Sequence, residues 1–120
     1  MMGPTHAAIG TATAMAACAL AQPSLTAGAI LVVTATLCSK LPDQLEMGIL
    51  RHRGPTHWLL TAVLVVTAIG FIPEFFADAR PYAGFVWAGA AIGYLMHIAA
   101  DMCTVSGVEV LGPFSRRDRW

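Results

Sequence analysis

Four apolar segments, separated by short polar ones, occupy most of this 120-residue chain. A transmembrane helix needs roughly 20 mostly apolar residues, within a range of about 17 to 25. Hydrophobic residues make up 57% of the sequence and charged residues 12%, too few to cover a water-soluble globule with polar surface. The sequence therefore predicts an all-α polytopic membrane protein, a single domain built as a bundle of about four transmembrane helices. We expect these helices over residues 6–22, 25–41, 56–72 and 82–102.

Three features of the sequence argue against a nucleic-acid partner, a CxxC site and a cleaved signal peptide. Basic residues are not interleaved with aromatic ones, so we expect no nucleic-acid partner. The three cysteines form no CxxC pair and lie in or beside apolar stretches, where free cysteine packs as a small hydrophobe. No basic segment precedes the first apolar run, so we expect no cleaved signal peptide and a retained His6.

The order of the four expected helices predicts that most polar residues meet at one membrane face. The first helix begins at that face, the second returns to it, the third leaves it and the fourth ends there. The polar residues on that face are His6, Asp43, Glu46, His52, His57, His97 and Asp101. Every Lys and Arg except Arg80 falls on the same face, which marks it as cytoplasmic. We therefore expect cytoplasmic termini and a basic tail, residues 115–120, that binds anionic lipid.

Two motifs carry the chemistry of this face. His97 and Asp101 are spaced i,i+4 on one helix face, and ionisable residues in a membrane segment rarely face lipid. They fit a metal site or, without metal, a proton relay. The segment from His52 through Arg53 to His57 places two imidazoles and a guanidinium just before an apolar helix. Its alternative interpretation is a set of interfacial cations at a positive-inside loop.

At these motifs the sequence resembles the YdjM-like family of bacterial inner-membrane proteins, predicted to be membrane-bound metal-dependent hydrolases. The matching blocks are Thr5-His6, Leu41-Pro42-Asp43, residues 52–57, residues 93–97 continuing to Asp101, Thr104 and 107–108, and Pro113-Phe114. The resemblance implies metal ligands at His6, Asp43, His57, His97 and Asp101. This sequence departs from the family pattern at Leu45, where a second acid is usual, and at Trp58, where serine is common. One expected ligand is therefore missing unless Glu46, the next residue, substitutes for it.

Such a site predicts zinc, with manganese as the second choice, and a coordination position for water whose pKa bound zinc lowers to about 7. Glu46, His52 and Arg53 are the expected catalytic residues, with Arg53 binding a substrate anion. A phosphoester of a lipid or another amphiphile at the cytoplasmic leaflet is the substrate class that this position favours. The alternative is a non-catalytic membrane subunit with a structural His/Asp cluster. Membrane lipid is the expected partner, together with a homo-oligomer or a larger membrane complex.

Overall fold

The computed structural model describes residues 3–46, 54–104 and 107–114. Its long helices are α1 (Gly3–Ala21), α2 (Leu25–Cys38), α4 (Leu59–Phe71) and α5 (Ala83–Met102), and α3 (Leu41–Glu46) is a short helix after α2. Single 3₁₀ turns, Pro55–His57, Ile72–Phe75 and Arg80–Tyr82, precede α4 and join it to α5. Within these described ranges there is no β-strand, so the all-α prediction is confirmed.

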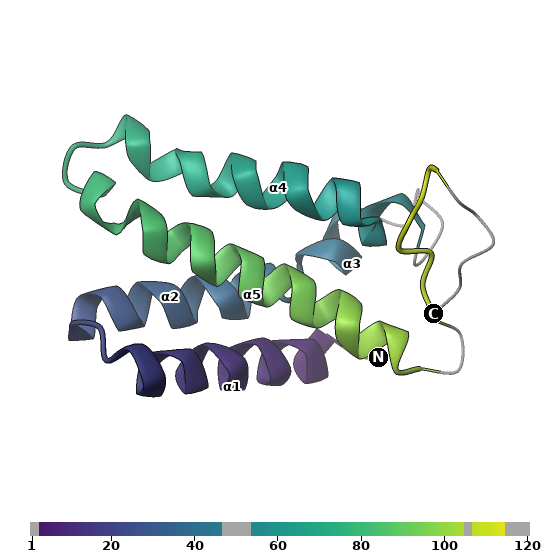
Figure 1. Cartoon of the computed structure of the whole chain (residues 1–120), viewed down its shortest axis with the longest axis horizontal. Helices are drawn as coiled ribbons and strands as arrows, with labels where there is room; N and C mark the ends of the chain where they lie inside the picture. The colour runs from purple at the N-terminus through teal and green to yellow at the C-terminus, as the bar shows by residue number, and fades with distance from the viewer. Residues whose placement is uncertain (1–2, 47–53, 105–106, 115–120) are drawn as a thin grey trace.

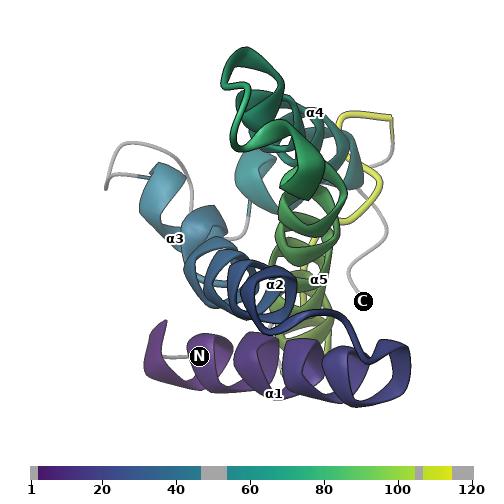
Figure 2. The same ribbon diagram turned by 90° about the vertical axis from the view of Figure 1, so that its left-hand side faces the viewer.

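Helix α5 is the central element of the bundle. It packs against α1, α2 and α4, whereas α1 and α2 form a hairpin on one side of it (Figure 1). The end-on view places α4 on the other side of α5 from α1 (Figure 2). The connection from α4 to α5 lies at one end of the bundle, and α3, the start of α1 and the end of α5 lie toward the other (Figure 1). Residues from several helices therefore meet at this second end.

Glycines allow α5 to approach α2 closely. A Cβ atom at Gly89 would lie 2.6 Å from the backbone oxygen of Leu31, and one at Gly93 would clash with the backbone oxygen of Ala35. The i,i+4 spacing of the two glycines places both on the face of α5 that contacts α2. Close backbone approach through small residues is how helices associate in lipid, where no hydrophobic force holds them together.

The large apolar side chains lie mostly on the outside of the bundle. Many of the buried apolar residues are alanines, including Ala14, Ala35, Ala62 and Ala90. Large exposed side chains follow the outer faces of the helices: Leu20, Leu25, Val33, Leu37, Val63, Leu64, Phe71, Phe75 and Trp87. A water-soluble protein buries such residues, and an apolar exterior around a small-residue interior fits a lipid environment.

Only one helical stretch in the described residues, Arg80–Met102, is both long and apolar enough to cross a membrane by itself. Leu25–Cys38 and Leu59–Phe75 are apolar but shorter. A break at Ser39 and Lys40 shortens the second expected helix, and the 3₁₀ turn Pro55–His57 shortens the third. The prediction of four membrane spans therefore stays a prediction.

Helix α3 was not expected, because residues from Asp43 onward read as a polar connection. Pro42 stands in the first turn of α3, where its missing N–H and fixed φ are tolerated. Helix α2 had already ended at Cys38. This new helix turns the chain at the end of the bundle and carries Asp43 and Glu46.

Candidate metal centre

Three segments bring four ligand-type side chains together at one end of the bundle. Asp43 stands in the first turn of α3, and His57 ends the 3₁₀ turn before α4. His97 and Asp101 lie one turn apart on the buried side of α5. The two histidines and Asp101 are buried, and the Asp43 side chain is 26% exposed. The cluster is therefore enclosed on every side except that of Asp43.

One atom from each side chain points to a common centre. His57 Nε2 lies 3.0 Å from His97 Nε2, 3.3 Å from Asp101 Oδ2 and 3.8 Å from Asp43 Oδ1. His97 Nε2 lies 3.4 Å from Asp43 Oδ1 and 3.5 Å from Asp101 Oδ2. All four ligand atoms are within 4.8 Å of one another.

These separations fit the donor set of a tetrahedral divalent ion. Nitrogen and oxygen ligands lie about 2.0–2.2 Å from zinc, so two of them at a tetrahedral angle are about 3.3–3.6 Å apart. Five of the six pairs in this tetrad, named above, lie between 3.0 and 3.8 Å. Two imidazoles and two carboxylates are also a ligand combination that such ions accept.

The hydrogen bond behind His97 fixes its tautomer. Its Nδ1 lies 2.6 Å from the backbone oxygen of Ser39. A carbonyl oxygen can only accept, so His97 Nδ1 must carry the proton and donate it. The ring thereby directs its Nε2 at the cluster, as in metal sites where the outer nitrogen of histidine donates to a carbonyl.

A relay of two side chains fixes His57 in the same way. The Thr56 hydroxyl donates to Glu46 Oε1 at 3.0 Å, which leaves its oxygen to accept from His57 Nδ1, also at 3.0 Å. Glu46 Oε1 itself lies 3.3 Å from His57 Nδ1. The Tyr94 hydroxyl donates to the Thr56 backbone oxygen at 2.6 Å and ties this turn to α5. His57 therefore also turns its Nε2 toward the cluster.

A cation fits the chemistry of this cluster. The two Nε2 atoms lie 3.0 Å apart, with two carboxylates beside them, in a mostly buried site. Burying such a group of acceptors is costly unless positive charge compensates it. The Nδ1 atom of each ring donates to an outer acceptor, so both rings keep Nε2 directed at the cluster. The residues present thus fit a bound divalent ion.

His6 adds a third imidazole at the edge of the tetrad. Its ring stacks on that of His97, with centroids 3.8 Å apart and planes at 26°. Its Nε2 lies 3.5 Å from Asp101 Oδ1, the oxygen that does not belong to the tetrad. Among the described residues neither ring nitrogen of His6 has a hydrogen-bond partner, although the side chain is buried. His6 is therefore in the centre but outside the group of four, and its role as a ligand stays a prediction.

Comparison with known proteins places this arrangement in a family. A family model described as the YdjM inner membrane protein matches residues 1–120, the whole chain. The chain belongs to the YdjM inner membrane protein family. The resemblance in its histidine and aspartate motifs is thereby confirmed. Searches among curated proteins and among solved structures find no match.

The structure of this YdjM-family chain brings together all five residues expected as metal ligands, four in the tetrad and His6 beside it. His52 and Arg53, expected as catalytic residues, lie outside the described residues, as does the basic tail. Glu46 faces the Nδ1 side of His57, away from the tetrad. Glu46 is therefore in contact with an imidazole of the tetrad, and its roles as a substitute acid and as a catalytic residue stay predictions.

Three contributors to the centre of this YdjM-family protein were not identified from the sequence. They are the backbone oxygen of Ser39 and the hydroxyls of Thr56 and Tyr94. Thr56 lies one residue before His57, and Tyr94 lies three residues before His97. Their positions within the histidine motifs were therefore a sign that they contribute to the centre. The Ser39 contact comes from the backbone, and no side-chain pattern could indicate it.

Proposed function

We propose that this protein is a membrane-bound metal-dependent hydrolase with its centre at Asp43, His57, His97 and Asp101. The observation that carries the proposal is the pair of Nε2 atoms, 3.0 Å apart beside two carboxylates, on rings whose Nδ1 atoms donate to outer acceptors. A divalent ion, zinc before manganese, would activate a water molecule or a substrate oxygen there. The sequence pattern of the family supports the same ligands.

The chain's own residues divide the work in this proposal. Ser39 and Thr56 hold the two imidazoles in the metal-binding tautomer, and Glu46 stabilises the Nδ1–H of His57. Asp43 lies on the side that solvent reaches, so substrate approaches past it. Because its carboxylate is the most exposed acid of the tetrad, Asp43 is also the group best placed to accept a proton from an incoming nucleophile.

We infer an amphiphilic phosphoester as the substrate class. An apolar cavity of about 350 Å³ lies beside the first turn of α4, which begins two residues after His57. It is lined by Leu59, Leu60 and Val63 and by residues of the 110–114 segment. A cavity of this kind accepts an acyl or isoprenoid chain. A chain in this groove would bring its polar end toward the centre, and Arg53 would bind the phosphate.

The proposal includes the membrane topology. Four helices in lipid, with both termini in the cytoplasm, would place the centre at the headgroup level of the cytoplasmic leaflet. The exposed apolar side chains of the helices support lipid as the partner that surrounds the bundle. A homo-oligomer or a larger membrane complex would supply further walls for a substrate, since the described chain has short connections and no soluble domain.

The first test is the metal content of the protein purified in detergent without a histidine tag. Elemental mass spectrometry should find about one zinc or manganese ion per chain. Asp101→Asn should lose it, because the amide keeps the shape of the side chain but is a poor metal ligand. Asp78→Asn is the matched control, since this exposed acid lies in the connection between α4 and α5, far from the tetrad. Folded wild type without metal, or Asp101→Asn with full metal content, contradicts the centre.

The second test addresses hydrolysis. Metal-loaded wild type should release headgroup from anionic phospholipids in mixed micelles, and Arg53→Ala and Asp101→Asn should release little. Circular dichroism of the same samples shows whether the fold is retained. Metal-loaded wild type that releases nothing from any phospholipid contradicts the proposed substrate class, and the metal content in the first test remains a separate result.

A structural role for the ion is the second candidate, and one observation favours it. Four protein ligands close a tetrahedron, which is typical of structural zinc sites, whereas catalytic sites keep a position for water. In that case metal removal lowers the melting temperature, and no substitution changes an enzymatic rate.

A proton relay is the third candidate function, because the distance between the two Nε2 atoms also suits one shared proton. It predicts a well-folded protein that binds no metal.

A further inference from the structure

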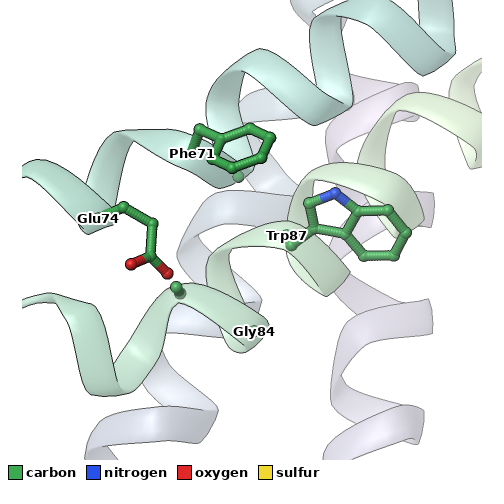
Figure 3. Close-up of a pocket in the computed structure, with 6 residues that line it drawn as sticks. Phe71, Glu74, Gly84 and Trp87 are labelled. Atoms are coloured by element: carbon green, nitrogen blue, oxygen red, sulfur yellow. The ribbon is translucent and has the colours of Figure 1, made fainter.

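A second cavity lies at the end of the bundle opposite the tetrad, where α4 passes into α5. Its volume is about 240 Å³. Its lining comes from the end of α4, the following 3₁₀ turn and the first turns of α5 (Figure 3). The lining residues are Gly70, Phe71, Glu74, Ala83, Gly84 and Trp87. Nothing in the proposed hydrolysis uses this cavity.

Two glycines give the cavity its shape. A Cβ atom at Gly70 would clash with the Trp87 indole, so the glycine lets the ring lie against α4. A Cβ atom at Gly84 would meet nothing within 4 Å, because Gly84 faces open space. The first glycine thus positions an aromatic wall, and the second leaves the volume beside it free.

The chemistry of the lining selects a cation. The Glu74 carboxylate points toward Gly84, and the rings of Phe71 and Trp87 lie farther along the lining of the cavity (Figure 3). Phe71 and Trp87 are 59% and 52% exposed, so their rings are accessible to a ligand. Aromatic faces beside a carboxylate are a recurring arrangement for binding an ammonium group. The Glu74 carboxylate adds a negative charge to a lining that is otherwise apolar.

A positive charge stands next to this acid. Arg80 Nε lies 3.4 Å from Glu74 Oε2, and its Nη2 donates to the Glu74 backbone oxygen at 3.0 Å. Arg80 does not line the cavity, and it is 63% exposed, so its guanidinium keeps donors for a second anion. The pair presents a negative charge inside the cavity and a positive charge beside it. These two charges are complementary to those of a zwitterion, whose positive group would face Glu74 and whose negative group would face Arg80.

We propose that this cavity binds the headgroup of a zwitterionic phospholipid, with the ammonium between Glu74 and Trp87 and the phosphate at Arg80. Membrane lipid is the source of such groups around a member of an inner membrane protein family. The neighbouring Phe75 and Phe76 are exposed, and aromatic side chains gather at the headgroup level of membranes. The cavity thus has the charge, the aromatic surface and the position that this headgroup requires.

Native mass spectrometry of the full chain in detergent tests the proposal. Wild type should bind dilauroyl phosphatidylethanolamine about threefold to tenfold more tightly than dilauroyl phosphatidylglycerol, which has the same chains and no ammonium. Glu74→Gln should remove this preference, and Asp78→Asn, in the same connection, should retain it. Gly84→Leu should fill the cavity and abolish the preference, whereas Gly84→Ala should keep it because the added methyl group meets nothing.

Three results overturn the assignment. They are equal binding of the two lipids to wild type, a preference that survives both Glu74→Gln and Gly84→Leu, and binding of free phosphoethanolamine as tight as that of the lipid. Metal content measured on the same samples should be unchanged in all four variants. The lipid site and the metal centre can therefore fail independently.

Discussion

At the scale of single residues, the chemistry of the centre depends on groups that do not touch its interior. His57 and His97 would bind a metal more weakly through Nε2 if their Nδ1 atoms lacked acceptors, because the ring proton could then sit on either nitrogen. The Ser39 carbonyl and the Thr56 hydroxyl remove that freedom. Tautomer control in this protein thus comes from one backbone atom and one hydroxyl.

Replacing Thr56 tests this control directly. Thr56→Val keeps the shape of the side chain but removes the hydroxyl group, which accepts a hydrogen bond from His57 and donates one to Glu46. We expect metal affinity to fall about 10- to 100-fold, the usual effect of losing such an outer hydrogen bond. Competition with a chromogenic chelator measures the affinity.

The matched control is Thr13→Val, since the Thr13 hydroxyl bonds only to the Ile9 backbone oxygen of its own helix. Its metal affinity should equal that of wild type. A Thr56→Val protein that binds metal as tightly as wild type would show that the hydroxyl does not set the tautomer.

At the scale of helices, the contact between α2 and α5 decides where His97 lies. Gly89 and Gly93 bring the two backbones together, and the same contact carries Ser39 within reach of His97 Nδ1. The same contact therefore determines both how α2 packs on α5 and how the His97 ring is oriented. A change in the distance between the two helices would alter both.

Gly93→Ala should be destabilising for this reason. The added methyl group would meet the backbone oxygen of Ala35, which cannot move aside as a flexible side chain does. We expect a loss of about 1–3 kcal/mol in unfolding free energy, the usual cost of overpacking. Gly84→Ala is the control, because the same change in open space should be neutral or stabilising by up to about 1 kcal/mol. Thermal unfolding in detergent compares them, and equal stability of the two variants would refute the close contact.

The helices and the ligands differ in how far the sequence could predict them. Continuous apolar runs indicated the long helices. The i,i+4 spacing indicated His97 and Asp101, and the helix order with the family resemblance indicated Asp43 and His57. Helix α3 was missed because six residues are too few to show a period. The stacking of His6 on His97 depends on how α1 packs against α5, and a single sequence contains no record of that packing.

At the scale of the whole molecule, the two ends of the bundle differ in chemistry. One end has the buried histidines and aspartates, and the other has an aromatic cavity with one acid. Helix α5 joins them, and its 20 residues correspond to a length of about 30 Å. That length equals the thickness of the hydrocarbon core of a bilayer. The proposed topology places one end in each leaflet.

Thiol labelling in intact cells tests this topology. Cys103 is exposed at the end of α5 near the tetrad, and Asp78 lies in the connection at the opposite end. In chains with a single exposed cysteine, a membrane-impermeant maleimide should label Asp78→Cys from outside the inner membrane. It should reach Cys103 only after permeabilisation. Labelling of both positions from the same side would refute the proposed crossing.

The ligand-type residues are far apart in the sequence, and this separation has a consequence for biosynthesis. His57 meets His97 across 40 residues of sequence, and Asp101 comes later still. At about 5–20 residues per second, translation takes roughly 2 to 8 seconds to supply His97 after His57. During that interval the nascent chain carries the first part of the centre without the second. A metal ion would therefore find its complete binding site only after α5 has been made, so a metal-loaded tetrad would require α5 to be in place in the bundle.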